Sequence, residues 1–250
     1  PLAGGGWWTD GYWRLLERIQ EDIAEVSPDK MLTTESNAEA YARWFDTYLM
    51  CNSLGDGLTP LFPAVYGSKI LGFGRYMSNQ DWDAPESLAQ KQGELYVWGT
   101  QLWWSAPEVI NHDFAGPWLR DLVHLRYQVR EFFNAGRMLA PPVFEGNDTM
   151  VTADWHRRDM FATTPAVIAT TWTVEDGRIL LPMINVSEEA QTVTLVFDPA
   201  RHGLNVDASF TVQRIGPDGA EQVGTWTGAT RHDISFEGVE PLALLLTPAD

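Results

Sequence analysis

The chain has 250 residues, 44% of them hydrophobic and 20% charged, a composition typical of a globular protein with one large domain or two smaller ones. This composition excludes a disordered or collagen-like chain, and the single cysteine, Cys51, excludes a scaffold of internal disulfides. The net charge of −17 would repel nucleic acid and anionic membranes, and no apolar run approaches the roughly 18 residues that cross a bilayer. Neither partner is expected.

The first eight residues contain neither an initiator methionine nor the basic and apolar regions of a signal peptide. We therefore expect this start to lie inside a longer chain. One unpaired cysteine does not decide the redox compartment, so a cytoplasmic and a secreted bacterial location both stay open.

A change of composition near residue 140 predicts two successive architectures. Residues 1–140 hold nine of the 12 tryptophans, whereas residues 141–250 are rich in threonine and valine. The proline- and glycine-containing segment 141–148 is typical of a turn-rich boundary. We therefore expect one domain over residues 1–140 and a second over residues 141–250.

The first half begins with alternating helix and strand signals. Apolar residues recur every three or four positions over residues 12–26, which predicts an amphipathic helix. A short β-prone run follows at residues 31–34, and the apolar spacing over residues 37–49 predicts a second helix. The order so far is helix, strand, helix.

Further along, residues 60–66 and 95–102 are apolar runs that predict strands, with a short helix near residues 86–92 between them. A long helix is predicted from Pro117, ending at Gly136. The strand starts at 31, 61 and 95 lie 30 and 34 residues apart, about one βα unit. This spacing favours parallel strands covered by helices.

A complete (β/α)8 barrel takes about 250 residues, so about 140 residues with three such strands predict only its C-terminal part. We expect the N-terminal half of the barrel to come from an upstream segment or from a partner chain. The second half of the sequence predicts an antiparallel β-sandwich, because short strand-like runs alternate with turn signals. The runs cover residues 166–174, 178–185, 191–197, 209–215, 220–226, 232–236 and 243–247.

Glu35 is the strongest candidate for a catalytic group. It follows the predicted strand at residues 31–34, and in a βα barrel the C-terminal strand ends carry the active site. A glutamate there can act as acid, base or nucleophile, or it can only cap the next helix or pair with an arginine. Spacing alone leaves these alternatives open.

Aromatic residues gather at other predicted strand ends and loops of the same face. Flat apolar rings with polar neighbours suit the C–H faces and hydroxyl edges of sugars, although tryptophans also fill space between a barrel and its helices. The candidates for sugar binding are Trp7, Trp8, Tyr66, Gln101, Trp103 and Trp104.

Other chemistry has little support in the sequence. The histidines show no metal-ligand spacing, so neither a metal nor another cofactor is expected. The glycines at positions 4–6 lack the Lys-Ser/Thr pair of a phosphate-binding loop. No G-x-S-x-G motif is present, and Cys51 lies in no nucleophile motif.

Several segments together resemble the C-terminal half of a glycoside-hydrolase-like barrel family whose members are similar to bacterial (β/α)8 glycosidases with a trailing β-sandwich. The resemblance runs in order over about residues 1–145. It is carried by PLAGGGWW at 1–8, LTTESNAEAY at 32–41, FD at 45–46, PLFPAVY at 60–66 and GTQL at 99–102.

This resemblance implies an O-glycosyl hydrolase that acts on an oligo- or polysaccharide through two carboxylates. It implies that Glu35 is one of them, as the general acid/base, and that the second lies upstream of Pro1. Two alternatives of another class stay open: a carbohydrate-binding protein without catalysis, and a purely structural fragment.

Overall fold

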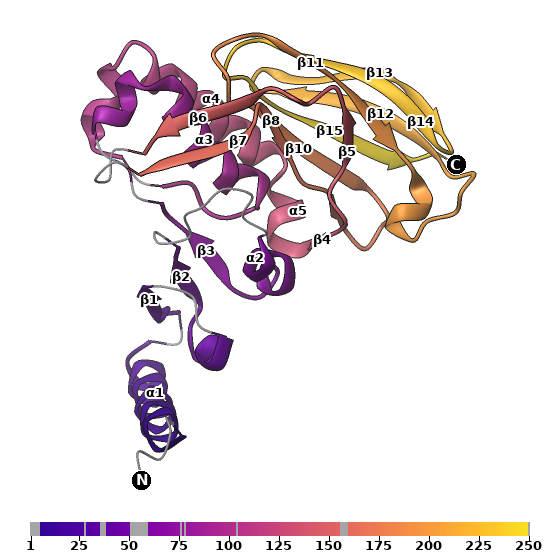
Figure 1. The fold of residues 1–250 in the computed structure, drawn as a ribbon. Coiled ribbons are helices and arrows are strands. Elements are labelled where there is room, and N and C mark those ends of the chain that lie inside the picture. The colour runs from indigo at the N-terminus through magenta and orange to yellow at the C-terminus, as the bar shows by residue number, and fades with distance from the viewer. Residues whose placement is uncertain are drawn as a thin grey trace.

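The computed structural model describes residues 6–27, 29–35, 39–50, 60–75, 77, 79–103, 105–155 and 160–249. The N-terminal part is narrow and holds a small parallel sheet with its helices, and the C-terminal part is broader and mostly antiparallel (Figure 1). Among the described residues, no helix combines the length and the apolar composition that a bilayer crossing requires.

The parallel sheet is built from short strands in sequence order. Strands β1 (Thr33–Glu35), β2 (Thr47–Leu49) and β3 (Leu71–Phe73) pair side by side, and Gln101 continues the sheet through a parallel bridge to Phe73. This order, with a helical segment between successive strands, is that of consecutive βα units. The segments around this sheet are α1 (Gly6–Val26), η1 (Glu39–Trp44), α2 (Leu61–Tyr66), η2 (Asn79–Asp83) and α3 (Pro85–Val97).

An aromatic core joins the outer helices to one face of this sheet. Tyr48 of β2 is fully buried and packs edge-on against Phe45 and Phe62, with ring centroids 5.6 and 5.3 Å apart. Leu16 is the buried residue of α1, whose other turns remain largely exposed. The predicted amphipathic helix and the predicted strand near residue 33 are therefore confirmed.

Three predicted elements were wrong. Residues 60–66 form helix α2 instead of a strand, because Pro60 and Pro63 fall before the helix and in its first turn, where a missing amide donor costs little. Residues 95–97 end helix α3, and only Gln101 of the predicted strand 95–102 joins the sheet. The predicted helix 37–49 ends at Trp44 and is followed by β2. A short apolar run fits either structure, which explains these errors.

The long helix predicted from Pro117 is confirmed, with a break near its end. It consists of α4 (Ala115–Gln128) and α5 (Arg130–Ala135), preceded by the short η3 (Pro107–Asn111). The predicted apolar face is buried throughout: Trp118, Leu122, Leu125, Val129 and Phe132.

The C-terminal part consists mostly of antiparallel strands. The larger sheet has the order β13-β12-β15-β10-β9-β4, with β8 paired to β10; the smaller has the order β14-β11-β5, and β6 pairs with β7 as a hairpin. The strands are β4 (Arg137–Met138), β5 (Val143–Glu145), β6 (Met150–Asp154), β7 (Phe161–Pro165), β8 (Val167–Ala169), β9 (Trp172–Thr173), β10 (Ile179–Asn185), β11 (Gln191–Phe197), β12 (Ser209–Gly216), β13 (Gly219–Thr227), β14 (Thr230–Phe236) and β15 (Pro241–Pro248), with η4 (Pro199–His202) after β11.

Strand β10 separates two hydrophobic cores. Its residues alternate: Leu181 and Met183 face the smaller sheet and complete a sandwich core, whereas Leu180 and Ile184 face the helices α3 and α4. Since both faces are covered, β10 is buried along its whole length. The sandwich predicted for the C-terminal half is therefore observed, and its larger sheet also supports the helices of the N-terminal half.

All the strand-like runs predicted after residue 165 form strands, whereas β5, β6 and β7 were not predicted. The sequence of segment 141–148 predicts a turn-rich boundary, yet in the structure Val143–Glu145 forms strand β5 and pairs with β11. The chain already enters the larger sheet at β4, where Met138 pairs with Trp172. The domain boundary near residue 140 stays a prediction.

Candidate functional site

The pairing register aligns four residues across the C-terminal ends of the parallel strands. Glu35 is opposite Leu49, Leu49 is opposite Phe73, and Phe73 bridges to Gln101. Neighbouring strands lie about 4.8 Å apart, so Glu35 and Gln101 are about 14 Å apart along the sheet. We call Glu35, Leu49, Phe73 and Gln101 the strand-end row.

The row faces away from the outer helices. Side chains alternate along a strand, and Tyr48, next to Leu49, packs on Phe62 of α2. Leu49 and its aligned partner Glu35 therefore project from the opposite face, the side that forms the interior of a barrel. Glu35 and Gln101 are both exposed on this face.

The indole of Trp103 lies over the strand ends next to this row. A Cβ built on Gly74 would lie 2.3 Å from two carbon atoms of the Trp103 ring and 2.5 Å from the Leu49 side chain. The ring therefore rests on the backbone just after β3, beside a member of the row. Trp103 as a whole residue is only partly buried.

A buried ion pair supports the backbone that follows β3. Arg75 pairs with Glu94 of α3, and their side chains are 1% and 8% exposed. The Arg75 guanidinium also lies over the rings of Trp98 and Trp155, at 4.7 and 5.1 Å from the centroids. Burial raises the pKa of Glu94, while the charge of Arg75 opposes this change.

The hairpin β6–β7 covers α3 and bonds to its polar residues. Lys91 forms a fully buried ion pair with Asp81 at 2.6 Å and donates to the carbonyl of Trp155 at 3.0 Å. The Gln90 amide donates to Thr164 at 3.2 Å and accepts from the Trp155 indole at 2.8 Å. The C-terminal half thereby helps to hold the loop between β3 and α3, which leads away from the strand ends.

A second set of bonds joins the loops after β3 and after Gln101. The Trp82 indole donates to Ser105 at 3.1 Å, and His112 Nε2 lies 3.1 Å from Asp83 Oδ1. The other ring nitrogen of His112 accepts from the amide of Ala115, the first residue of α4, at 3.0 Å. These contacts fix the two loops that border Trp103.

The other predicted sugar-binding residues lie elsewhere or outside the described residues. Tyr66 lies on α2, on the face of the sheet opposite Glu35, and its hydroxyl donates to Glu39 at 2.5 Å, which raises the pKa of Tyr66. Trp7 and Trp8 are exposed in the first turn of α1. The structure thus brings Gln101 and Trp103 onto the same sheet end as Glu35, and Trp104 lies outside the described residues.

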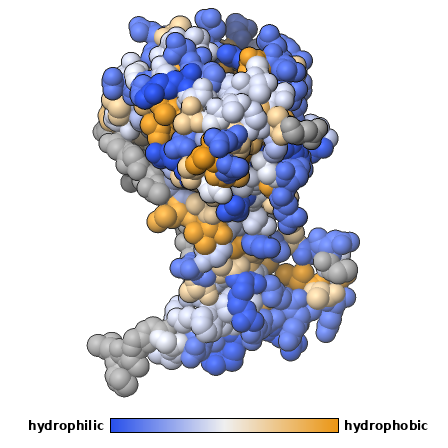
Figure 2. All heavy atoms as spheres, turned by 90° about the vertical axis from the view of Figure 1, so that its right-hand side faces the viewer, coloured by the Kyte–Doolittle hydropathy of each residue, from blue (hydrophilic) through white to orange (hydrophobic). Residues whose placement is uncertain are grey.

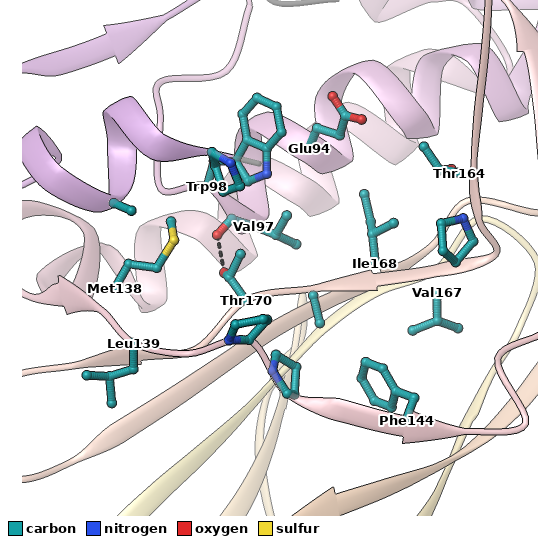
Figure 3. Close-up of a pocket in the computed structure, with 16 residues that line it drawn as sticks. Glu94, Val97, Trp98, Met138, Leu139, Phe144, Thr164, Val167, Ile168 and Thr170 are labelled. Carbon is teal, nitrogen blue, oxygen red and sulfur yellow. Dashed lines mark hydrogen bonds between the residues drawn. The ribbon is translucent and has the colours of Figure 1, made fainter. Parts of the chain in front are cut away.

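A separate pocket of about 460 Å³ lies between the two halves of the chain (Figure 3). Its walls are mostly apolar and include Trp98, Leu139, Phe144 and Ile168. Figure 3 shows the carboxylate of Glu94 directed away from the centre of this pocket. Among the described residues, no group of three or more His, Cys, Asp and Glu side chains is placed to hold a metal ion.

Hydrophobic residues are exposed together at the waist of the molecule, where the C-terminal and N-terminal parts meet (Figure 2). Helix α2 lies in this region in Figure 1, and its residues Leu61 and Val65 are 68% and 64% exposed.

A family model described as "Domain of unknown function (DUF6259)" matches residues 1–78. The matched region contains strands β1, β2 and β3, with Glu35 at the end of β1, and also Gly74, which follows β3.

Curated relatives with significant similarity carry glycoside hydrolase names. The chain is 29% identical over 201 residues to "Putative glycoside hydrolase" of Bacteroides thetaiotaomicron and 25% identical over 254 residues to "Putative glycoside hydrolase 22789" of Monosiga brevicollis. The matches cover 77% and 88% of this chain but 28% and 21% of those proteins. The chain thus spans about a quarter of the length of these relatives.

Solved glycosidases share the fold. A GH27 β-L-arabinopyranosidase of Geobacillus stearothermophilus, in complex with arabinose, aligns with a TM-score of 0.54 and 11% identity over 94% of this chain and 54% of that chain. The maltogenic α-amylase AmyB of Thermotoga neapolitana gives 0.54 and 18% identity over 93% and 58%. The α-galactosidase of Saccharomyces cerevisiae, solved with raffinose, gives 0.53 and 5% over 96% and 69%. The likeness therefore extends across both halves of this chain.

Proposed function

We propose that this chain contributes the second half of the active site of a glycoside hydrolase. Residues 1–140 form the C-terminal part of a (β/α)8 barrel and residues 141–250 form the accessory β-sandwich. The parallel register of β1, β2, β3 and Gln101 supports this proposal, as does the fold likeness to solved glycosidases. The names of the curated relatives support the same reaction class.

The observation that carries the proposal is the place of Glu35 in the strand-end row. The carboxylate ends β1 and projects from the interior face, where barrel enzymes keep their reacting groups. In the proposed reaction, Glu35 donates a proton to the leaving glycosidic oxygen and so acts as general acid. In a retaining mechanism it would then take a proton from the attacking water.

The second carboxylate comes from the other half of the barrel in this proposal. Strand β1 pairs only with β2 among the described residues, so its other edge is open to a further parallel strand. Glu35 and Gln101 lie at the two ends of the row and are exposed in this chain. Both would lie inside the barrel once the additional strands closed it. The additional strands come from the same polypeptide or from a partner chain.

In this proposal the sugar ring stacks on the face of the Trp103 indole that is turned away from Gly74, beside Glu35 and Gln101. The indole offers an apolar face to the C–H groups of a sugar ring, and the Gln101 amide offers both a donor and an acceptor to hydroxyl groups. The sequence also suggests four aromatic residues for this role: Trp7, Trp8, Tyr66 and Trp104. Of these, Tyr66 would need a substrate that extends beyond the interior face, since it lies behind the sheet.

The test uses a polypeptide that carries the complete barrel and a panel of methyl glycosides and oligosaccharides, whose leaving oxygens need a proton. Glu35→Gln is expected to lower kcat/KM by about 10²- to 10⁴-fold, the range for loss of a general acid. Glu25→Gln, a change at an exposed glutamate in the last turn of α1, serves as the matched control. Equal activity of both variants would remove Glu35 from the chemistry. If the wild type bound sugar without hydrolysing it, a carbohydrate-binding protein would be favoured. If the wild type neither bound nor hydrolysed sugar, a structural role would be favoured.

A further inference from the structure

The indole of Trp103 lies against the backbone of Gly74, in the space that a side chain at this position would occupy. The Gly74 φ of +76° lies in the left-handed region, which residues with a side chain rarely adopt. The position of a Cβ on Gly74 is already occupied, with two ring carbons of Trp103 at 2.3 Å and a Leu49 carbon at 2.5 Å. Contacts this short do not occur between real atoms, so any larger residue must displace the ring or the strand.

Gln92 fixes the same tryptophan from the side of α3. Its side chain is completely buried, and its carbonyl oxygen accepts a hydrogen bond from the backbone amide of Trp103 at 3.2 Å. The bond to Gln92 thus fixes the backbone of Trp103, and the contact with Gly74 fixes the place of its ring. Gly74 and Trp103 lie in loops that leave the strand-end row, and Gln92 holds the second of these loops from α3.

We propose that Gly74 and Gln92 are positioning residues that hold the Trp103 indole as a stacking platform for one sugar ring at the end of the parallel sheet. This inference rests on the proposed function, in which Trp103 contacts the sugar. Gly74 permits the indole to lie directly on the strand end next to Leu49, level with Glu35. A bulkier residue would displace the platform from this position.

The experiment observes Trp103 directly, without relying on activity. The full chain is labelled with 5-fluorotryptophan, and the ¹⁹F resonance of Trp103 is assigned by its loss in Trp103→Phe. Gly74→Ala is expected to shift this resonance, because the new methyl group displaces the ring. The matched control is Gly146→Ala, which has the same φ of +76° and no atom within 4 Å of the new Cβ. It adds equal backbone strain without touching Trp103.

A second variant protects the test against misfolding of Gly74→Ala. Gln92→Met removes the acceptor for the Trp103 amide at similar side-chain length and is expected to broaden or shift the same resonance. If the Trp103 resonance is unchanged in both variants, the positioning role is overturned. If Gly146→Ala shifts it as far as Gly74→Ala does, strain and not ring contact is responsible, and the inference also fails.

A sugar titration separates this inference from the proposed function. Methyl glycosides of glucose, galactose and xylose are added to the labelled wild type in a polypeptide that carries the complete barrel. A glycoside that shifts the Trp103 resonance supports the role of Trp103 as a stacking platform. The apparent Kd of that glycoside is expected to be about threefold to tenfold higher for Gly74→Ala than for the wild type. If no glycoside moves it while Gly74→Ala still does, the sugar role is wrong and the positioning contact stands.

Discussion

Glu35 and Leu49 are direct partners in the parallel pairing of β1 and β2, and this partnership decides which way the glutamate faces. The residue before Leu49, Tyr48, is fully buried against the outer helices. Because neighbouring residues of a strand point to opposite sides, Glu35 is directed away from those helices. A one-residue shift of register would bury the carboxylate in an aromatic core.

Tyr48 provides a test of this arrangement through its ionisation. Burial raises its pKa to about 12, so the neutral phenol is favoured in the folded state. This stabilisation is fully present below the unfolded pKa of about 10 and is lost as the pH rises toward 12. When the pH is raised from 9 to 11.5, the free energy of unfolding should fall in both proteins. The fall should be about 1–2 kcal/mol smaller in Tyr48→Phe than in the wild type, because phenylalanine does not ionise.

The measurement is urea denaturation at both pH values. Tyr127→Phe, at a tyrosine that is 64% exposed, is the control and should follow the wild type. An identical alkaline loss in Tyr48→Phe and the wild type would contradict the burial of Tyr48 between sheet and helices.

The buried pair of Lys91 and Asp81 predicts an asymmetric response to mutation. Each side chain is 0% exposed, so Asp81→Asn or Lys91→Met leaves the other group in an environment that disfavours its charge. Either single change should cost about 3–5 kcal/mol of unfolding free energy. The double variant should be more stable than the sum of the two losses predicts, as a double-mutant cycle would show. Additive losses would indicate that the two groups do not depend on each other.

Strand β10 should be sensitive to truncation on both faces. Leu180→Ala opens a cavity beside the helices and Leu181→Ala opens one in the sandwich, and each should cost about 2–5 kcal/mol. Val223→Ala, at a residue that is 48% exposed on β13, should change the stability by less than about 1 kcal/mol. If only Leu181→Ala were destabilising in chemical denaturation, the helical core would not be packed on this sheet.

Much of the C-terminal half could be predicted from the sequence because its signals are local. The strand from Gln191 to Phe197 alternates buried and more exposed residues, and the turns around Gly177 and Gly219 require glycine at positive φ. Hairpins join neighbours in sequence, so alternation and turn chemistry suffice to find them. The fold likeness to glycosidases agrees with the predicted combination of βα units and sandwich.

The elements around the parallel sheet were harder to predict because long-range contacts decide them. Residues 60–66 and 95–102 are apolar runs that fit a strand or a buried helix equally well. Helix α3 carries Lys91, Gln92 and Glu94, which suggest an exposed face, yet all three are buried because their partners come from distant loops and the β6–β7 hairpin.

The same reason explains what could be found at the candidate site. The position of Glu35 after a short strand was visible in the sequence, since it depends on neighbouring residues. The contact of Gly74 with Trp103 joins loops 29 positions apart, and an isolated glycine carries no sign of its partner. Tyr66 was misplaced because its position was inferred from a strand that is a helix.

The most direct test of the central claim is the leaving-group dependence of Glu35→Gln in a polypeptide with the complete barrel. A general acid matters most when the departing oxygen is a poor leaving group. We predict that Glu35→Gln keeps a kcat/KM close to that of the wild type on 2,4-dinitrophenyl glycosides, but that its kcat/KM on methyl glycosides or oligosaccharides is at least about 10²-fold lower. Equal rates of wild type and variant on both substrate types would contradict the assignment of Glu35 as the general acid.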